Sequence, residues 1–342
     1  MNPNLLQVRL GLLTAFSASL VLAFFNICIR VLIQRREPQR ILGGWLEIQG
    51  MIIPNFGNSL LILFLRLLVV ILVMPILATF LYPGTWDDLK RFLAQRDRRL
   101  WLTVISSAFC LFLSQIFIYI SLGNITPGIA ITLFFIYPLI TILGAWILFG
   151  NRPSFIGGVG LGGVMLGLLI TGSPSFGVSP YGNPGIGVLT ALGAGFTFAG
   201  YVLLTQMAAG KLHPVPFSLI HFLGLFVLAS VSLILVGAGL PLPPSWQISL
   251  ESSAREGFIL GCSILGILTL FSYLLNNCAI RLAGAALSAI VGTLGPALTG
   301  ILALLILGEN LREIQWLGLS VVTISVAIIS LDRIVQLQES QE

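Results

Sequence analysis

The sequence predicts an all-α integral membrane protein with ten transmembrane helices arranged as two inverted five-helix repeats. Its composition, the lengths of its apolar runs and an internal repeat support this prediction. Charged residues make up 8% of the 342 residues and hydrophobic residues 57%, with a mean hydropathy of +1.03. Ordinary soluble domains are about 25% charged. The apolar runs reach the roughly 20 residues that a helix needs to cross the membrane, so lipid is the expected solvent.

Apolar runs bounded by charged residues, Pro or Gly place the ten helices along the chain. They are expected near residues 9–32, 59–82, 100–122, 127–149, 154–172, 184–208, 216–238, 255–278, 283–307 and 313–332. The first run is too long for the apolar region of a signal peptide, so it should remain as a span. Only the segments 33–58 and 83–99 are sizeable polar connections, which leaves no room for a folded soluble domain.

Basic residues in the connections predict the orientation, because Lys and Arg are retained on the cytoplasmic side. With the amino terminus inside, ten of them are internal: Arg9, Lys90, Arg91, Arg96, Arg98, Arg99, Arg152, Lys211, Arg281 and Arg333. Five are external: Arg35, Arg36, Arg40, Arg255 and Arg312. Both termini, including a tail at 333–342, are therefore expected in the cytoplasm, at the cell (inner) membrane of a bacterial-type cell. The net charge of +5 reflects this topology, and no nucleic-acid partner is expected.

The chain matches itself at two offsets. An offset of 158 residues aligns helices three to five with helices eight to ten, pairing Ser114 with Ser272, Pro138 with Pro296, Thr141 with Thr299 and Gly160 with Gly318. An offset of 176 aligns helix one with helix six, pairing Gly11 with Gly187 and Ala18 with Ala194. The difference fits an insertion in the first copy, within 33–58. The repeats are therefore expected at 9–172 and 184–332.

An odd number of spans in each unit makes the second unit enter the membrane from the opposite side. Inverted repeats offer two nearly equivalent packings, which is the physical basis of alternating access in many secondary transporters. We therefore interpret the chain as a secondary transporter or exporter of a small polar metabolite, such as an amino acid. Duplication retained only for stability is the alternative interpretation.

Two matching segments resemble a known family. YPLITILGAWILFGN (137–151) and GPALTGILALLILGEN (295–310) are similar to the ends of the two EamA domains of the drug/metabolite transporter superfamily. Arg66 also falls where members often carry an Arg in helix two. The resemblance implies a central cavity lined mainly by helices one, three, four, six, eight and nine, and export or exchange of small metabolites. Two features depart from it: Asn151 stands where Glu309 keeps the usual acid, and the first connection is unusually long.

All twelve acidic residues fall in connections, tails or helix ends. A buried Asp or Glu is the usual device for binding a cationic drug and exchanging it for protons, so its absence argues against efflux of that type. His221 is the intramembrane group whose unperturbed pKa suits proton coupling. A hydrogen-bonded packing role is the alternative for this side chain.

Polar residues near the expected midplane are the candidates for binding a solute. Arg66 costs about 2.5 to 3.5 kcal/mol at a helix centre unless it snorkels, and it would suit a substrate carboxylate or phosphate. Hydroxyls and amides suit a zwitterion or a neutral solute. The residues selected are Asn26, Arg66, Tyr119, Thr141, Tyr201, Ser272 and Asn277. Interhelical hydrogen bonding is the alternative role for each of them.

Pro138 and Pro296 lie at equivalent midpoints of helices four and nine, where each removes a backbone hydrogen bond and permits a kink. Interrupted helices in matching positions indicate a substrate site, so both are candidate hinges, with static kinks as the alternative. The glycines at 158, 162, 163 and 167 fit close helix packing or a homodimer.

A membrane enzyme acting on lipid or prenyl carriers would need paired acids, a metal cluster or a Ser/His base pair. The spans offer none of these, so we expect no catalytic residue, no metal and no cofactor. The expected partners are a small-molecule substrate and the lipid bilayer. A lipid flippase or an accessory membrane subunit without solute transport remains the alternative.

Overall fold

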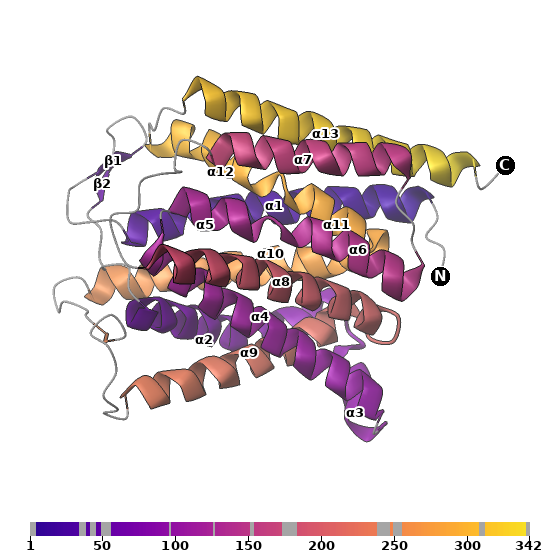
Figure 1. Ribbon diagram of the computed structural model, residues 1–342. Coiled ribbons are helices and arrows are strands. Elements are labelled where there is room, and N and C mark those ends of the chain that lie inside the picture. The colour runs from indigo at the N-terminus through magenta and orange to yellow at the C-terminus, as the bar shows by residue number, and fades with distance from the viewer. Residues whose placement is uncertain are drawn as a thin grey trace.

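The computed structural model is a bundle of long helices, with both marked termini at the same end (Figure 1). The structure describes residues 5–33, 39–41, 46–48, 56–95, 97–125, 127–150, 154–172, 183–237, 247–248, 255–307 and 312–339. The long helices run roughly along the length of the bundle, so its two ends carry the connections (Figure 1).

The helices follow the expected order. The first half contains α1 (Leu5–Ile33), α2 (Phe56–Leu81), α3 (Thr85–Ala94), α4 (Arg98–Asn124), α5 (Pro127–Phe134), α6 (Tyr137–Phe149) and α7 (Phe155–Gly172). The second half contains α8 (Pro184–Ala209), α9 (Pro214–Gly237), α10 (Arg255–Ala283), α11 (Ala285–Gly292), α12 (Gly295–Leu302), the π-helical turn η5 (Ala303–Leu307) and α13 (Glu313–Glu339). Polar caps fix some of the starts: the Asp97 carboxylate accepts from the backbone N–H of Arg99, 3.0 Å away, at the start of α4.

Seven helical segments in the described part of the chain are long and apolar enough to cross a membrane, and three shorter apolar helices accompany them. The shorter ones are Tyr137–Phe149, Phe155–Ile170 and Glu313–Ile329. Large apolar side chains such as Ile147 and Phe155 are mostly exposed, which suits contact with lipid. The chain is thus a helical integral membrane protein with multiple apolar spans, as predicted.

Three local features differ from the sequence prediction. The expected continuous helices 127–149 and 283–307 are each interrupted, between α5 and α6 and between α11 and α12. The connection 83–99 contains the helix α3, whose apolar residues recur every three or four positions. The connection 33–58 contains a two-stranded antiparallel hairpin of β1 (Gln39–Ile41) and β2 (Leu46–Ile48), so the fold is not wholly helical.

The packing relates the two halves of the chain. The most extensive helix contacts are α4 with α8, α1 with α10, α7 with α13, and α2 with α9. At the sequence offsets, α1 corresponds to α8 and α4 to α10. The repeat relation therefore converts the α1–α10 contact into the α8–α4 contact. The other two pairs map onto themselves, because α7 and α13 are counterparts, as are α2 and α9. This is the pattern that a twofold relation between the halves produces.

Glycines allow matching close contacts in both halves. A Cβ added at Gly11 of α1 would lie 2.6 Å from the Cβ of Ala283, at the end of α10. A Cβ added at Gly187 of α8 would lie 2.5 Å from Cγ2 of Ile125, just beyond α4. The glycines are 176 residues apart and their partners 158, so the two contacts are copies of one arrangement.

Candidate functional site

The interruptions of the two broken helices occupy matching positions. Two turn residues, 135–136, separate α5 from α6, and two others, 293–294, separate α11 from α12. Pro138 and Pro296 are the second residues of α6 and α12. Each helix is interrupted just before its proline rather than kinked through it. Proline has no N–H to donate to the carbonyl oxygen four residues earlier and its ring crowds that carbonyl, so the helix restarts with the proline in its first turn.

Arg66 brings a charge into the middle of α2. Its side chain is 2% exposed, and its Nη2 donates to Oε1 of Gln115 on α4 at 2.8 Å. The ring of Phe25 on α1 covers the guanidinium, with 5.1 Å between Cζ and the ring centroid. The Nε atom is buried and has no hydrogen-bond partner. Arg66 does not snorkel to an interface, contrary to the alternative that sequence allowed.

Gln115 links Arg66 to the second half of the chain. Its Nε2 donates to the Oη of Tyr273 on α10 at 3.3 Å, and Tyr119 Oη lies 3.5 Å from its Oε1, at the limit of a hydrogen bond. Gln115 and Tyr273 are 158 residues apart, so they are counterparts in the two repeats. Counterparts meet only near the axis that relates the repeats, so this polar cluster lies close to that axis.

Tyr201 and Asn277 form a second polar contact beside the first. Tyr201 Oη donates to Oδ1 of Asn277 at 2.7 Å, and Asn277 Nδ2 donates to the Oγ of Ser218 at 2.8 Å. All three side chains are buried. At the repeat offsets, Tyr201 corresponds to Phe25 and Asn277 to Tyr119. The two halves thus carry different side chains at equivalent positions, and the buried cation Arg66 belongs to the first half alone.

His221 lies on α9 in an aromatic environment. Its Nδ1 is 3.1 Å from the Oγ of Ser107, whose hydroxyl already donates to the carbonyl oxygen of Val104. The single hydroxyl proton of Ser107 is then used, so we assign the imidazole proton to Nδ1. The ring packs against Tyr201 and Phe217, and Nε2 is buried without a partner.

The remaining predicted residues form hydrogen bonds that do not involve Arg66, Gln115 or Tyr273. Asn26 Nδ2 donates to Oγ1 of Thr299 at 3.2 Å, joining α1 to α12. Thr141 and Ser272 donate to carbonyl oxygens of their own helices, those of Tyr137 and Thr269. Of the predicted residues, Arg66 and Tyr119 both contact Gln115, and Tyr201 bonds to Asn277. The hydrogen bonds of Asn26, Thr141 and Ser272 are made elsewhere.

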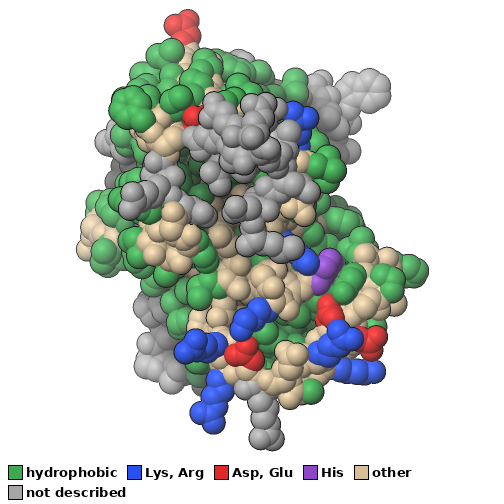
Figure 2. Space-filling model, turned by 90° about the vertical axis from the view of Figure 1, so that its right-hand side faces the viewer, with side chains coloured by type: hydrophobic (Ala, Val, Ile, Leu, Met, Phe, Trp, Pro, Cys, Tyr) green, Lys and Arg blue, Asp and Glu red, His purple; other side chains and the backbone are tan. Residues whose placement is uncertain are grey.

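Polar side chains also join the two halves at the end of the bundle where the termini lie. Lys211, after α8, forms a 2.7 Å ion pair with Asp97, before α4. The ring of Tyr82, after α2, stacks on His213, before α9, with 4.0 Å between centroids. Burial and the charge of Arg281 lower the pKa of His213. Figure 2 looks onto this end and shows charged side chains gathered over part of it, beside hydrophobic flanks.

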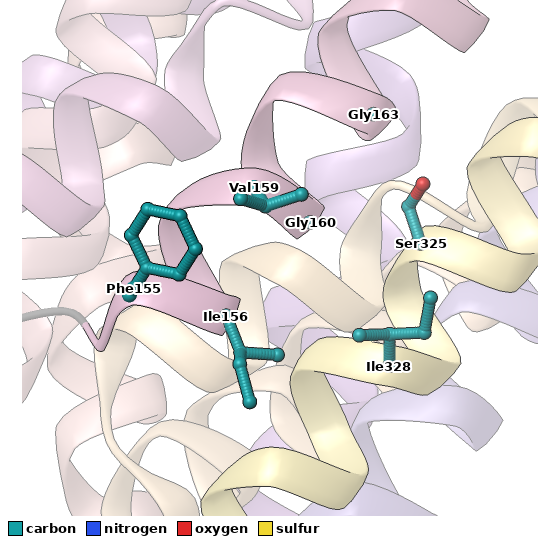
Figure 3. A pocket seen from close by; sticks show the side chains of 7 residues that line it. All are labelled: Phe155, Ile156, Val159, Gly160, Gly163, Ser325 and Ile328. Carbon is teal, nitrogen blue, oxygen red and sulfur yellow. The ribbon is translucent and has the colours of Figure 1, made fainter.

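Two apolar grooves of about 290 Å³ each lie away from the polar cluster. One runs between α7 and α13 and is lined by Phe155, Ile156, Val159, Gly160, Gly163, Ser325 and Ile328 (Figure 3). The other lies between α6 and α8 and is lined by Ile136, Ile140, Leu189, Leu192, Gly193 and Phe196. Neither lining includes a predicted binding residue.

Sequence comparison decides the family. A model of the EamA-like transporter family matches residues 44–173 and 185–331. The chain belongs to the EamA-like transporter family. It contains two EamA domains and is a transporter, not an enzyme, as the sequence predicts. The departures at Asn151 and Glu309 fall outside the described residues.

Similar proteins cover nearly the whole chain. It is 33% identical to the uncharacterized transporter sll1319 of Synechocystis sp. (strain ATCC 27184 / PCC 6803 / Kazusa) over 339 residues, which are 97% of this chain and 95% of that protein. A protein of known crystal structure aligns with a TM-score of 0.66 at 17% identity, covering 94% of this chain and 97% of the other. That likeness shows a common fold for the EamA-like chain.

Proposed function

We propose that this protein is a secondary transporter or exporter that moves a small polar metabolite, of amino-acid size, by alternating access. Its ten spans would form two inverted five-helix repeats at 9–172 and 184–332. Both termini would lie in the cytoplasm, at the cell (inner) membrane of a bacterial-type cell. The substrate would bind between the repeats, near the axis that relates them.

The observation that carries this proposal is the exchange of helix pairs between the two halves. The α1–α10 contact is repeated as α8–α4, down to the glycine contacts of Gly11 and Gly187. Two packings of nearly equal energy are expected from such a duplicated arrangement, one open at each end. The polar cluster of Arg66, Gln115 and Tyr273 lies where such a carrier would hold its substrate.

The end where the termini lie supports a closed state on that side. Lys211 and Asp97 bridge the α8–α9 connection and the start of α4, and Tyr82 stacks on His213 between α2 and α9. Each contact joins one repeat to the other. Opening this end requires both to separate, so they act as a gate in the proposed cycle.

The binding set that we propose combines the predicted residues with the hinges. Asn26, Arg66, Tyr119, Thr141, Tyr201, Ser272 and Asn277 would contribute to binding, and the helix restarts at Pro138 and Pro296 would bend during the cycle. Proton coupling, if present, would use His221. The aromatic surroundings of His221 and its lack of a carboxylate partner among the described residues favour a packing role instead.

Transport is tested with the purified protein in proteoliposomes. Uptake of labelled amino acids, sugars and nucleotides is measured with and without a pH gradient. Asn277→Ala is expected to reduce flux per folded molecule, because it removes a buried amide beside the proposed site. Unchanged flux would exclude Asn277 from the site. Phospholipid scrambling without any solute flux would support the lipid-flippase alternative.

The inverted topology is tested by cysteine labelling. The native Cys28, Cys110, Cys262 and Cys278 are first replaced, and single cysteines are introduced at Lys211 and at Asn183. A membrane-impermeant maleimide applied to intact cells should label position 183 and spare position 211. Labelling of both positions from the outside would contradict the topology.

A further inference from the structure

Arg66 carries an uncompensated charge inside the bundle. It is the one Lys or Arg among the buried side chains that the structure describes. Neither ion pair found in the described part of the chain includes it. A neutral amide, that of Gln115, accepts from its Nη2, while its Nε remains without an acceptor. A charge buried inside a membrane protein without a counter-ion marks a functional site.

We propose that Arg66 binds a carboxylate group of the transported solute and that Gln115 occupies its place in the empty carrier. This inference rests on the proposed function. A guanidinium donates in a planar fork that matches the two oxygens of a carboxylate. One oxygen would accept from the vacant Nε and the other from Nη2, displacing Oε1 of Gln115.

The charge balance selects a monocarboxylate over a phosphate. A phosphate carries close to two negative charges at neutral pH and is usually held by more than one cation or by several backbone N–H groups. Counting 158 residues from Arg66 leads to Gly224 on α9, so the second repeat supplies no equivalent guanidinium. The other half of the cluster is neutral, with Tyr201 and Asn277. One positive charge beside neutral hydroxyl and amide groups suits a solute with a single carboxylate and a polar or apolar remainder.

Displacement of Gln115 would also change a hydrogen bond between the two repeats. Gln115 Nε2 is bonded to Tyr273, its counterpart near the axis. When a carboxylate takes Nη2 of Arg66, the Gln115 side chain must move, and its bond to α10 changes with it. The anion is thereby linked to the contact between the repeats.

The test uses matched acids and amides that share a carbon skeleton. The purified protein is melted with propionate or propionamide, lactate or lactamide, and L-phenylalanine or L-phenylalaninamide, each over a range of concentrations. The wild type is expected to be stabilised by the acid of at least one pair more strongly than by its amide. Arg66→Gln should weaken binding of that acid by about tenfold or more, and Arg66→Lys by less.

Gln115→Glu provides a second, independent arm. Its carboxylate would occupy the Arg66 fork permanently, so the variant should melt at or above the wild-type temperature and yet lose acid binding. Gln95→Glu, an exposed position after α3, adds the same charge elsewhere and should bind as the wild type. If Arg66→Gln does not fold, Arg66→Lys and Gln115→Glu decide the question.

Several outcomes would overturn the inference: acid binding retained in Arg66→Gln or in Gln115→Glu, equal binding of acids and amides, or no acid in the panel that shifts the wild type. Parallel uptake assays separate this failure from failure of the proposed function. Flux of a neutral solute that is indifferent to Arg66 would leave the transporter proposal standing alone. Acid binding without flux of any solute would support the Arg66 binding site and contradict the proposed transport function.

Discussion

The packing of α7 against α13 makes a sharp prediction about Gly167. A Cβ added there would lie 2.8 Å from the carbonyl oxygen of Gly318 and 2.9 Å from the backbone N of Val322. These are main-chain atoms, which cannot rotate away as a flexible side chain can. Gly162 lies on the same helix, and an added Cβ there would meet no atom within 4 Å. Gly162→Ala is therefore a matched control for Gly167→Ala.

The expected cost follows from this geometry. Ordinary Cβ contacts begin near 3.4 Å, so α13 would have to move by about 0.6 Å to accept the Gly167→Ala methyl group. Overpacking of this kind costs about 1 to 3 kcal/mol, and alanine returns up to about 1 kcal/mol through its higher helix propensity. With the full alanine gain subtracted, Gly167→Ala should destabilise the protein by up to about 2 kcal/mol, while Gly162→Ala should be neutral or stabilising.

The measurement is reversible unfolding in mixed micelles of rising SDS content, followed by tryptophan fluorescence. The midpoint should fall for Gly167→Ala and should hold or rise for Gly162→Ala. Equal midpoints in the two variants would refute the close approach of α7 and α13. A lower midpoint for Gly162→Ala alone would mean that the exposed face of α7 is covered by a partner, such as a second copy of the chain.

Two further predictions concern individual side chains. Tyr201→Phe removes the 2.7 Å bond to Asn277 and should lower the unfolding free energy by about 0.6 to 2 kcal/mol in the same titration; an unchanged midpoint would show that Asn277 is satisfied elsewhere. Burial and Arg281 hold the pKa of His213 below its ordinary value, with Asp88 opposing them, so the unfolded chain takes up a proton first as the pH falls. Wild-type melting temperature should therefore drop as the pH falls through about 6.5, and His213→Gln should flatten that profile; identical profiles for the two proteins would contradict the assignment.

Hydropathy predicted the positions of most spans because the length of an apolar run reflects the thickness of the bilayer. It did not reveal the interruptions, since residues 127–149 and 283–307 contain no charged residue and each reads as one span. Hydropathy measures contact with lipid and carries no information on whether the helix is continuous. Pro138 and Pro296 mark the regions, but the turns precede them because proline cannot donate to the carbonyl oxygen four residues earlier and is tolerated in the first turn of the helix that follows. The helix α3 was missed because its mixed composition resembles a polar connection, although Trp86, Leu89 and Phe92 repeat at helical spacing.

The candidate site was partly predictable from residue type. The expectation for Arg66, Tyr201 and Asn277 rests on the cost of long polar groups in lipid, and all three side chains are buried and hydrogen-bonded to other helices. Their partners, Gln115 and Ser218, are not in the predicted set. Gln115 matters because it bonds to two other helices, through Arg66 and Tyr273. Ser218 cannot be told from sequence apart from a serine that bonds to its own helix. The repeat offset held a usable signal, because Gln115 and Tyr273 align at 158 residues.

The matching glycine contacts imply that substitutions at Gly11 and Gly187 should have opposite effects on which end of the bundle opens. Enlarging Gly11 would loosen the seam at the end that holds the termini, whereas enlarging Gly187 would loosen the seam at the far end. In a carrier that alternates between a state open at one end and a state open at the other, each substitution should favour a different one of these states. The double substitution should bring their populations back toward those of the wild type, in a less stable protein. Duplication would then have supplied the chain with two opposed controls over a single equilibrium.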